Sequence, residues 1–293
     1  MPKYPTSSAR STKAPKRAKV FVRLPPASIT MTALRPMPAL PLEIYTYILE
    51  LADCATLASA ARVNSTFQHE AETVLYKDLF IWGSVGTIAL SRSLLLTGRK
   101  HRITALRRFR PFVVHDDSRD PDLAPSIKSI LDAASNLTDL SLEIPCSIPI
   151  APDKPIQLKR LHANQAFDDN MLDLLAKVPF LKTLCIMKPS KLSTVDSSIV
   201  PALESIEGTG AVVALFVPHR PVRKVKVLRD AWEDTVTVGT LLDALAKSTV
   251  HLEHLSLFVS HKSSDVLAAV AQRLPHLRTL EIQNIEPSHW VLI

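Results

Sequence analysis

The chain has 293 residues, of which 46% are apolar and 22% charged, and these proportions predict a globular protein with an extensive hydrophobic core. Only 6 glycines stand beside 22 prolines, which disfavours β-hairpin architectures and glycine-rich nucleotide-binding loops, because both need many residues with positive φ. Cys54, Cys146 and Cys185 are too few for a disulfide framework, and they predict free, mostly buried thiols in a reducing compartment.

The formal net charge of +7 comes from the N-terminal segment. Of the 35 Lys and Arg residues, 8 lie in residues 1–39, which hold no acid, so 27 basic residues face 28 acidic ones in the rest of the chain. Because this segment is also rich in serine and proline, we expect residues 1–39 to be a disordered basic tail. Three interpretations of its cluster 13–19 stay open: a solvated tail without a partner, a nuclear import signal, and a mitochondrial presequence, which the prolines oppose.

No apolar run approaches the roughly 20 residues that a membrane helix needs. The longest run, residues 211–217, has the length of a strand. The first ten residues also lack the apolar segment of a secretory signal. We therefore expect a protein of the cytoplasm or the nucleus, without a membrane partner.

Three short helices are expected over residues 40–80. The first begins at Pro41, the second covers residues 56–62, and the third begins at a capping box formed by Ser65 and Gln68. A unit of about 40 residues cannot bury this many large side chains by itself. We expect it to expose an apolar face that binds a partner. The alternative is that the unit only packs against the domain that follows.

This segment resembles the F-box over about 41 residues, through Leu40-Pro41-x-Glu43-Ile44, Ile48-Leu49, Leu57, Val63-Asn64, Phe67 and Val74-Leu75-Tyr76. It departs from the family at Asn64-Ser65, where Cys before a basic residue is common, and at Phe67, where Trp is common. The resemblance implies binding to a Skp-type adaptor and, through it, to a cullin-RING ubiquitin ligase, while the rest of the chain recruits a protein substrate. The implied adaptor face consists of Leu40, Pro41, Ile44, Ile48, Leu49, Leu57, Val63 and Leu75.

Seven copies of an apolar-x-x-apolar pattern follow, with spacings of 21, 23, 22, 19, 30 and 25 residues. The copies begin at Leu137, Leu158, Leu181, Leu203, Val222, Leu252 and Leu277. This period resembles that of leucine-rich repeats, in a degenerate form in which Gly208 and Ala163 occupy apolar positions. The predicted fold class is α/β: a three-helix F-box followed by an irregular leucine-rich-repeat solenoid with a parallel sheet on its concave side.

The expected domains are the tail, the F-box at 40–80, a helical linker with one possible eroded repeat at 81–135, and the solenoid at 136–293. The linker should hold helices at 84–96 and 125–134 and a strand at 109–114, and the solenoid should hold helices at 169–177, 240–247 and 265–273.

Strand side chains alternate, so the residues between the buried leucines should face the concave surface. We expect this surface to bind the target protein. The candidate target-binding residues are Arg160, His162, Met187, Lys224, Lys226, His254, Phe258 and Glu281.

Signatures of catalysis are missing from the sequence: it has no G-x-S-x-G elbow, no P-loop and no dinucleotide fingerprint. The pair His251 and His254 lies on strand register with one ring facing out, which disfavours a zinc site. We expect no catalytic residue, no metal, no cofactor and no specific nucleic acid. The main hypothesis is a substrate-recognition subunit of the ligase. The alternatives are an interaction scaffold outside ubiquitination and an enzyme with a cryptic site.

Overall fold

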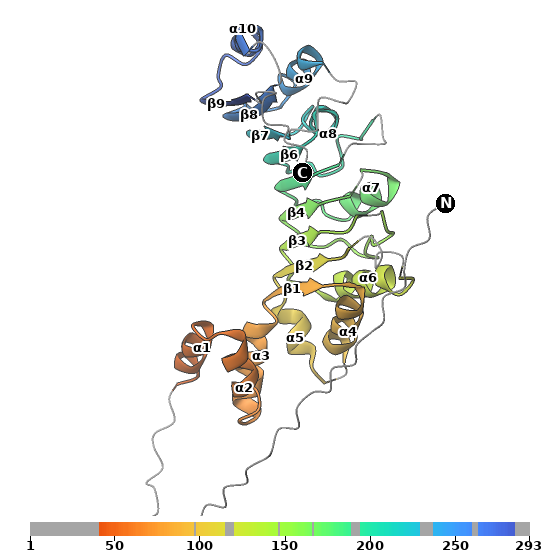
Figure 1. Ribbon diagram of the computed structural model, residues 1–293, viewed down its shortest axis with the longest axis vertical. Coiled ribbons are helices and arrows are strands. Elements are labelled where there is room, and N and C mark those ends of the chain that lie inside the picture. The colour runs from red at the N-terminus through yellow and green to blue at the C-terminus, as the bar shows by residue number, and fades with distance from the viewer. Residues whose placement is uncertain are drawn as a thin grey trace, which may run out of the picture. The chain divides into compact units, whose positions relative to one another are not determined.

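A computed structural model describes residues 41–96, 98–114, 120–145, 147–165, 167–188, 194–228, 237–259 and 263–284 (Figure 1). The predictions for the tail, for Leu40 and for Cys146 lie outside these ranges. The residues from Pro41 onward belong to one compact unit. Within the described ranges, every helix is too short or too polar to span a bilayer.

The chain begins with three short helices, α1 (Leu42–Glu50), α2 (Cys54–Ala60) and α3 (Ser65–Leu75). Asp53 caps α2 by accepting a hydrogen bond from the Thr56 amide at 2.7 Å. The predicted capping box of α3 is wrong, because Asn64 is the cap and its Oδ1 accepts from the Phe67 amide at 2.9 Å. An asparagine directly before a helix competes well for this position.

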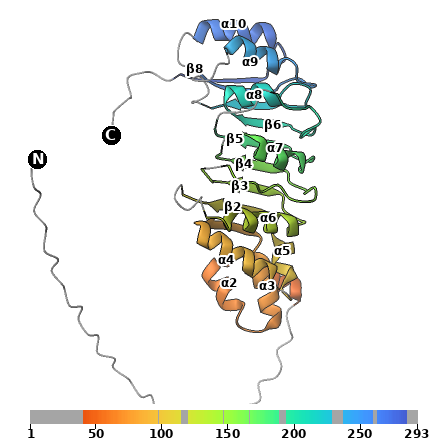
Figure 2. The same cartoon turned by 90° about the vertical axis from the view of Figure 1, so that its right-hand side faces the viewer.

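Nine strands form one sheet in which every neighbouring pair is parallel and the strand order follows the chain (Figures 1 and 2). The α/β class with a parallel sheet is thereby confirmed. The strands are β1 (Asp78–Trp82), β2 (Arg108–Phe112), β3 (Asp139–Leu142), β4 (Arg160–Ala163), β5 (Thr183–Ile186), β6 (Ser205–Gly208), β7 (Lys224–Val227), β8 (His254–Val259) and β9 (Thr279–Asn284).

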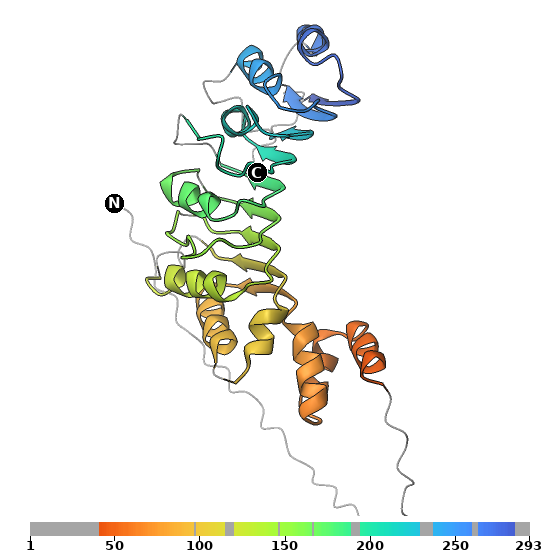
Figure 3. The same cartoon turned by 180° about the vertical axis from the view of Figure 1, so that it is seen from behind.

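Helices cover only one face of this sheet (Figure 3). The remaining helices are α4 (Ser84–Leu95), α5 (Lys100–Ala105), α6 (Leu123–Ala133), α7 (Asp169–Ala176), α8 (Gly210–Phe216), α9 (Val238–Leu245) and α10 (Ser263–Arg273). The second residue of strands β2 to β8 points under these helices, is fully or almost fully buried, and lies beside its equivalent in the next strand. These residues are Phe109, Leu140, Leu161, Leu184, Ile206, Val225 and Leu255. One continuous core therefore runs along the sheet.

Each of the seven predicted apolar patterns forms a strand that begins two residues after its first apolar residue. The expected helices also form, within two residues of their predicted ends. Two segments differ. The run 211–217, which has the length of a strand, belongs to helix α8, whose cap Thr209 accepts from the Val212 amide. Residues 78–82 form strand β1, which overlaps the end of the predicted three-helix segment 40–80.

A buried carboxylate joins α3 to the segment that follows β1. Glu72 is 4% exposed and accepts hydrogen bonds from the Arg99 guanidinium at 2.6 Å and from Arg102 at 2.7 and 2.8 Å. The His101 Nε2 lies 2.7 Å from its second oxygen, and the Gln68 amide donates at 3.0 Å. The hydrogen bonds from Arg102 come first among the causes that lower the pKa of Glu72 to about 2.

A buried arginine fastens the loops on the helical side of the sheet. Arg220 is 1% exposed, and its guanidinium donates to the carbonyl oxygens of Asp196 at 2.6 Å and of Ile199 and Phe216 at 2.9 Å. Burial lowers the pKa of Arg220, since the charged form loses its hydration. These carbonyl groups thereby obtain the donors that buried backbone oxygens require.

Candidate interaction surfaces

Helix α1 exposes a stripe of large apolar side chains. Ile44, Ile48 and Leu51 follow one another at spacings of four and three residues, so they share one helix face, and Tyr47 lies beside them. Ile48 is 52% exposed and Leu51 is 75% exposed. We call these four residues the α1 stripe. Leu42 and Val63 are also exposed. Exposed apolar surfaces of this kind are typical of interaction sites.

The interior of the three-helix unit is small. Leu49, Leu57 and Ala71 are its fully buried apolar residues, and the rings of Tyr45 and Phe67 pack edge to face at 5.0 Å. Leu49 and Leu57 are only 3% and 4% exposed. These two members of the expected adaptor face therefore have a packing role.

The other members of the expected adaptor face differ in their exposure. Pro41, Ile44, Ile48 and Val63 are exposed, while Leu75 is half-buried against the interior of the unit. Leu40 lies outside the described residues. The structure thus separates the expected face into exposed residues and residues that hold the helices together.

The sheet face without helices carries all eight expected target-binding residues. Lys224, Lys226, His254 and Glu281 line one shallow hollow of about 400 Å³ over β6 to β9. The Lys226 ammonium pairs with Glu207 at 2.6 Å, and this hydrogen bond raises the pKa of Lys226.

The other four expected residues lie outside this hollow. Arg160 pairs with Asp139, and the His162 Nδ1 lies 3.1 Å from a carboxylate oxygen of Glu143. Met187 is exposed directly after β5, and Phe258 is half-buried on β8.

Ser256 occupies the floor of this hollow. Its side chain is buried, and its Oγ has no hydrogen-bond partner among the residues that the structure describes. A buried hydroxyl without a partner costs free energy, about 1–3 kcal/mol, which a bound polar group would recover. The sequence predicts that Ser256 lies on the open face of the sheet. It does not predict that the hydroxyl is buried without a hydrogen bond, because this depends on the neighbouring strands β7 and β9.

Two of the cysteines are described, and both are free thiols. The expectation of burial is wrong for Cys54, which is exposed near the start of α2. Cys185 is partly exposed on the helix-free face, where desolvation, followed by the negative charge of Glu207, raises the pKa of its thiol to about 12. Cys185 is therefore a neutral thiol at neutral pH and a poor nucleophile.

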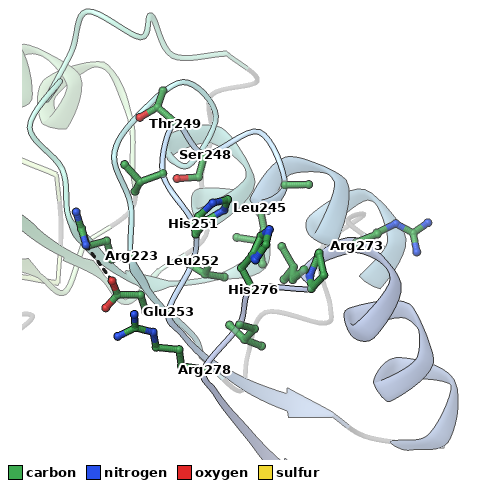
Figure 4. A pocket seen from close by; sticks show the side chains of 15 residues that line it. Arg223, Leu245, Ser248, Thr249, His251, Leu252, Glu253, Arg273, His276 and Arg278 are labelled. Atoms are coloured by element: carbon green, nitrogen blue, oxygen red, sulfur yellow. Dashed lines mark hydrogen bonds and ion pairs between the residues drawn. The ribbon is translucent and has the colours of Figure 1, made fainter.

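A second, larger hollow of about 770 Å³ lies where the turns after α9 and α10 enter β8 and β9 (Figure 4). The rings of His251 and His276 contact each other there with centroids 4.0 Å apart. Arg223 pairs with Glu253 at 2.9 Å. We call this hollow the edge pocket. As expected, His251 precedes a buried leucine while His254 lies on the sheet face. No group of three or more metal-ligating side chains occurs among the residues the structure describes.

An aromatic cluster on β1 and β2 escaped the sequence analysis. Trp82 stacks on Phe112 at 4.1 Å, Phe80 lies 6.5 Å from Phe112, and Arg110 lies over the Phe80 ring at 5.9 Å. Phe80 and Trp82 are 55% and 62% exposed on the helix-free face. Residues 79–82 are all apolar, so the sequence shows no alternation of polar and apolar residues that would have revealed this exposed cluster.

No protein-family model matches this chain, and no curated protein matches it either.

Proposed function

We propose that this protein is the substrate-recognition subunit of a Skp-cullin-F-box type ubiquitin ligase. The three-helix unit binds the Skp-type adaptor, the helix-free sheet face binds a target protein, and the transfer of ubiquitin takes place on other subunits. The chain itself catalyses nothing and needs no cofactor in this proposal. It acts in the cytoplasm or the nucleus.

The α1 stripe carries this proposal. Its four large side chains are exposed, while Leu49, Leu57 and Ala71 are the buried apolar residues of the unit among those the structure describes. Each large apolar side chain that moves fully from water into an interface contributes about 1.5–3 kcal/mol, so burial of the stripe offsets a substantial part of the cost of association. The resemblance of residues 40–80 to the F-box identifies the adaptor as the partner.

The nine-stranded sheet supports the second half of the proposal. Its stability resides in the backbone ladder and in the buried row beneath the helices, so side chains on the open face are free to serve recognition. Eight neighbouring strand pairs keep these side chains in fixed register. A rigid array of this kind presents an extended binding surface.

Capture of a purified Skp-type adaptor by the full chain tests the proposal. Ile48→Asp places a charge in the α1 stripe without disturbing the interior, and we expect it to weaken adaptor binding at least about tenfold. Val85→Asp is the matched control, because Val85 is equally apolar and 77% exposed but lies on α4. Leu49→Asp should instead unfold the three-helix unit.

Equal adaptor binding by the wild type and by Ile48→Asp would refute the proposed docking face. A wild-type protein that ignores the adaptor, yet still binds other proteins through the sheet face, would be an interaction scaffold outside ubiquitination. Circular dichroism of each variant shows whether lost binding reflects lost structure.

A further inference from the structure

The edge pocket has an excess of positive charge. Its lining holds Arg223, Arg273 and Arg278 but only one carboxylate, that of Glu253. Arg223 is paired with this carboxylate, and Arg273 pairs at 2.6 Å with Asp243, which lies outside the lining. The Arg278 guanidinium has no hydrogen-bond or ion-pair partner among the described residues. One cation is thus left to bind an external anion.

The remaining polar groups of the pocket favour the same kind of ligand. The rings of His251 and His276 lie together in the lining, whereas Arg278 lies nearer to Glu253 (Figure 4). The Ser248 hydroxyl is already used, because it donates to the carbonyl oxygens of Arg220 and Val222 at 3.0 Å. An imidazole offers a ring N–H donor, so the hydrogen-bond donors that the edge pocket can offer to a ligand come from the histidines and from Arg278.

The lining of the pocket also includes apolar residues. They are Leu245, Ala246, Val250, Leu252, Leu274, Pro275 and Leu277. An aliphatic side chain of a ligand can pack on such residues, while the unpaired guanidinium of Arg278 favours a negative charge. Stacking of nucleic-acid bases needs exposed aromatic platforms, and apart from its two histidines the lining has no aromatic residue. A peptide with an apolar and an anionic residue side by side matches this combination.

The edge pocket and the hollow over β6 to β9 are lined by neighbouring residues of the chain. Glu253 and Arg278 line the edge pocket, and the next residues of the chain, His254 and Thr279, line the hollow over β6 to β9. A peptide that leaves the edge pocket across β8 and β9 reaches the unpartnered hydroxyl of Ser256. Both hollows can therefore contact one extended ligand.

We infer that the edge pocket binds an anionic peptide of the target protein, with a carboxylate or phosphoryl group on Arg278 and an aliphatic neighbour on the apolar residues of the lining. This inference rests on the proposed function in one respect, namely that the repeat unit binds a protein. It names the chemical class of that target.

Binding of degenerate peptide pools to the full chain tests the inference. Each nine-residue pool carries Leu followed by a fixed residue, either Glu, phosphoserine or Gln, with the other positions randomised. We expect the wild type to retain the Glu or phosphoserine pool at least about tenfold more than the Gln pool, because only the first two supply the anion. Arg278→Glu should abolish this preference.

Lys159→Glu is the matched control. Lys159 is exposed and follows the first apolar residue of its repeat, as Arg278 does, but it lies outside the edge pocket. The same charge change there should leave the preference unchanged. Hydrogen exchange of β8 and β9 in Arg278→Glu verifies that this variant is folded.

Each outcome decides one point. Preference for phosphoserine over Glu identifies a phosphorylated target, and equal retention identifies an acidic one. Equal retention of the Gln pool, no effect of Arg278→Glu, or displacement of the peptides by a single-stranded oligonucleotide at lower concentration would overturn the inference. Adaptor capture by the same variants separates this result from the proposed function, since Arg278→Glu should retain the adaptor fully.

Discussion

Glu72 shows how a single residue holds the three-helix unit to the sheet. Its carboxylate receives hydrogen bonds from Arg99, Arg102 and Gln68 while its side chain is almost completely buried. A buried carboxylate is tolerated only with such partners. The orientation of α3 against α5 therefore depends on the charge state of one side chain.

Replacing Glu72 by Gln should lower the free energy of unfolding by about 3 kcal/mol, because two arginines would lose their buried acceptor. Chemical denaturation measures this change. Glu50→Gln is the control, since Glu50 pairs at 3.1 Å with Lys77 on the surface, where both side chains are about half-exposed and such pairs contribute about 0–1 kcal/mol.

The same carboxylate predicts a dependence of stability on pH. The pKa of Glu72 is lowered from 4.5 to about 2 on folding, so its contribution is complete above pH 4.5 and is lost as the pH falls toward 2. Between these values the wild type should lose its stability advantage over Glu72→Gln. A difference that stays constant over this range would contradict the assignment.

The partners of Glu72 could not be predicted from the sequence. They lie 27 to 30 residues further along the chain, and the periodicity of α3 shows only a charged residue within a helix. Local patterns report which face a residue occupies, whereas the approach of Arg99 and Arg102 depends on how α5 packs against α3.

At the scale of single elements, β6 explains an irregularity of the repeat. The pattern at Leu203 ends in Gly208, where the other copies have a larger residue. In the structure, a Cβ atom added to Gly208 would lie 2.9 Å from the backbone oxygen of Ile186 on the neighbouring strand. The close approach of β5 and β6 excludes any side chain at this position.

Gly208→Ala should therefore destabilise the protein by about 1–3 kcal/mol, since backbone atoms have to move. Gly239→Ala, in helix α9, should raise the stability by about 0.5 kcal/mol, because the nearest atom to the new Cβ lies at 3.8 Å and alanine favours helices. Thermal unfolding shows whether the melting temperature falls in Gly208→Ala and rises in Gly239→Ala. Destabilisation of equal size in both would refute this explanation of β6.

Hydrophobic pattern predicted the strands of this sheet better than some of its helices. An apolar-x-x-apolar pattern fixes both the buried face and the start of a strand, and all seven such segments form strands. Helix α8 was not predicted, because its valines favour strands and the Thr209 cap is the one local signal for a helix. Strand β1 was not predicted, because Phe80 and Trp82 are apolar residues on its exposed face and hide the alternation that is typical of a strand.

At the scale of the whole molecule, each strand in the described part of the chain pairs with its neighbours in sequence and with no other described strand. Stability in such an array is the sum of unit and neighbour contributions, so a defect at the middle interrupts contacts on both sides and a defect at an end interrupts one. Leu184 is fully buried in β5, and Leu280 has the same register position in β9, where it is partly buried.

Leu184→Asp should unfold most of the sheet, whereas Leu280→Asp should affect only β8, β9 and α10. Hydrogen exchange measured by mass spectrometry shows which segments lose protection. Loss of protection in β3 and β4 of Leu280→Asp would mean that the array unfolds as one cooperative block.

The candidate surfaces were only partly predictable. Alternation along the strands placed Lys224, His254 and Glu281 on the open face, where they lie together. The edge pocket was missed because it is built by turns from two consecutive units, and no pattern within one unit predicts that Arg278 and His251 line the same pocket. The exposed aromatic cluster was missed together with β1.

The separation between the buried row and the open face has an evolutionary consequence. Substitutions on the open face leave the hydrogen-bond ladder and the core unchanged. The residues that contact a ligand can therefore be substituted rapidly in evolution without loss of the fold. Proteins with the same fold and different binding partners can therefore evolve through single substitutions that each preserve folding.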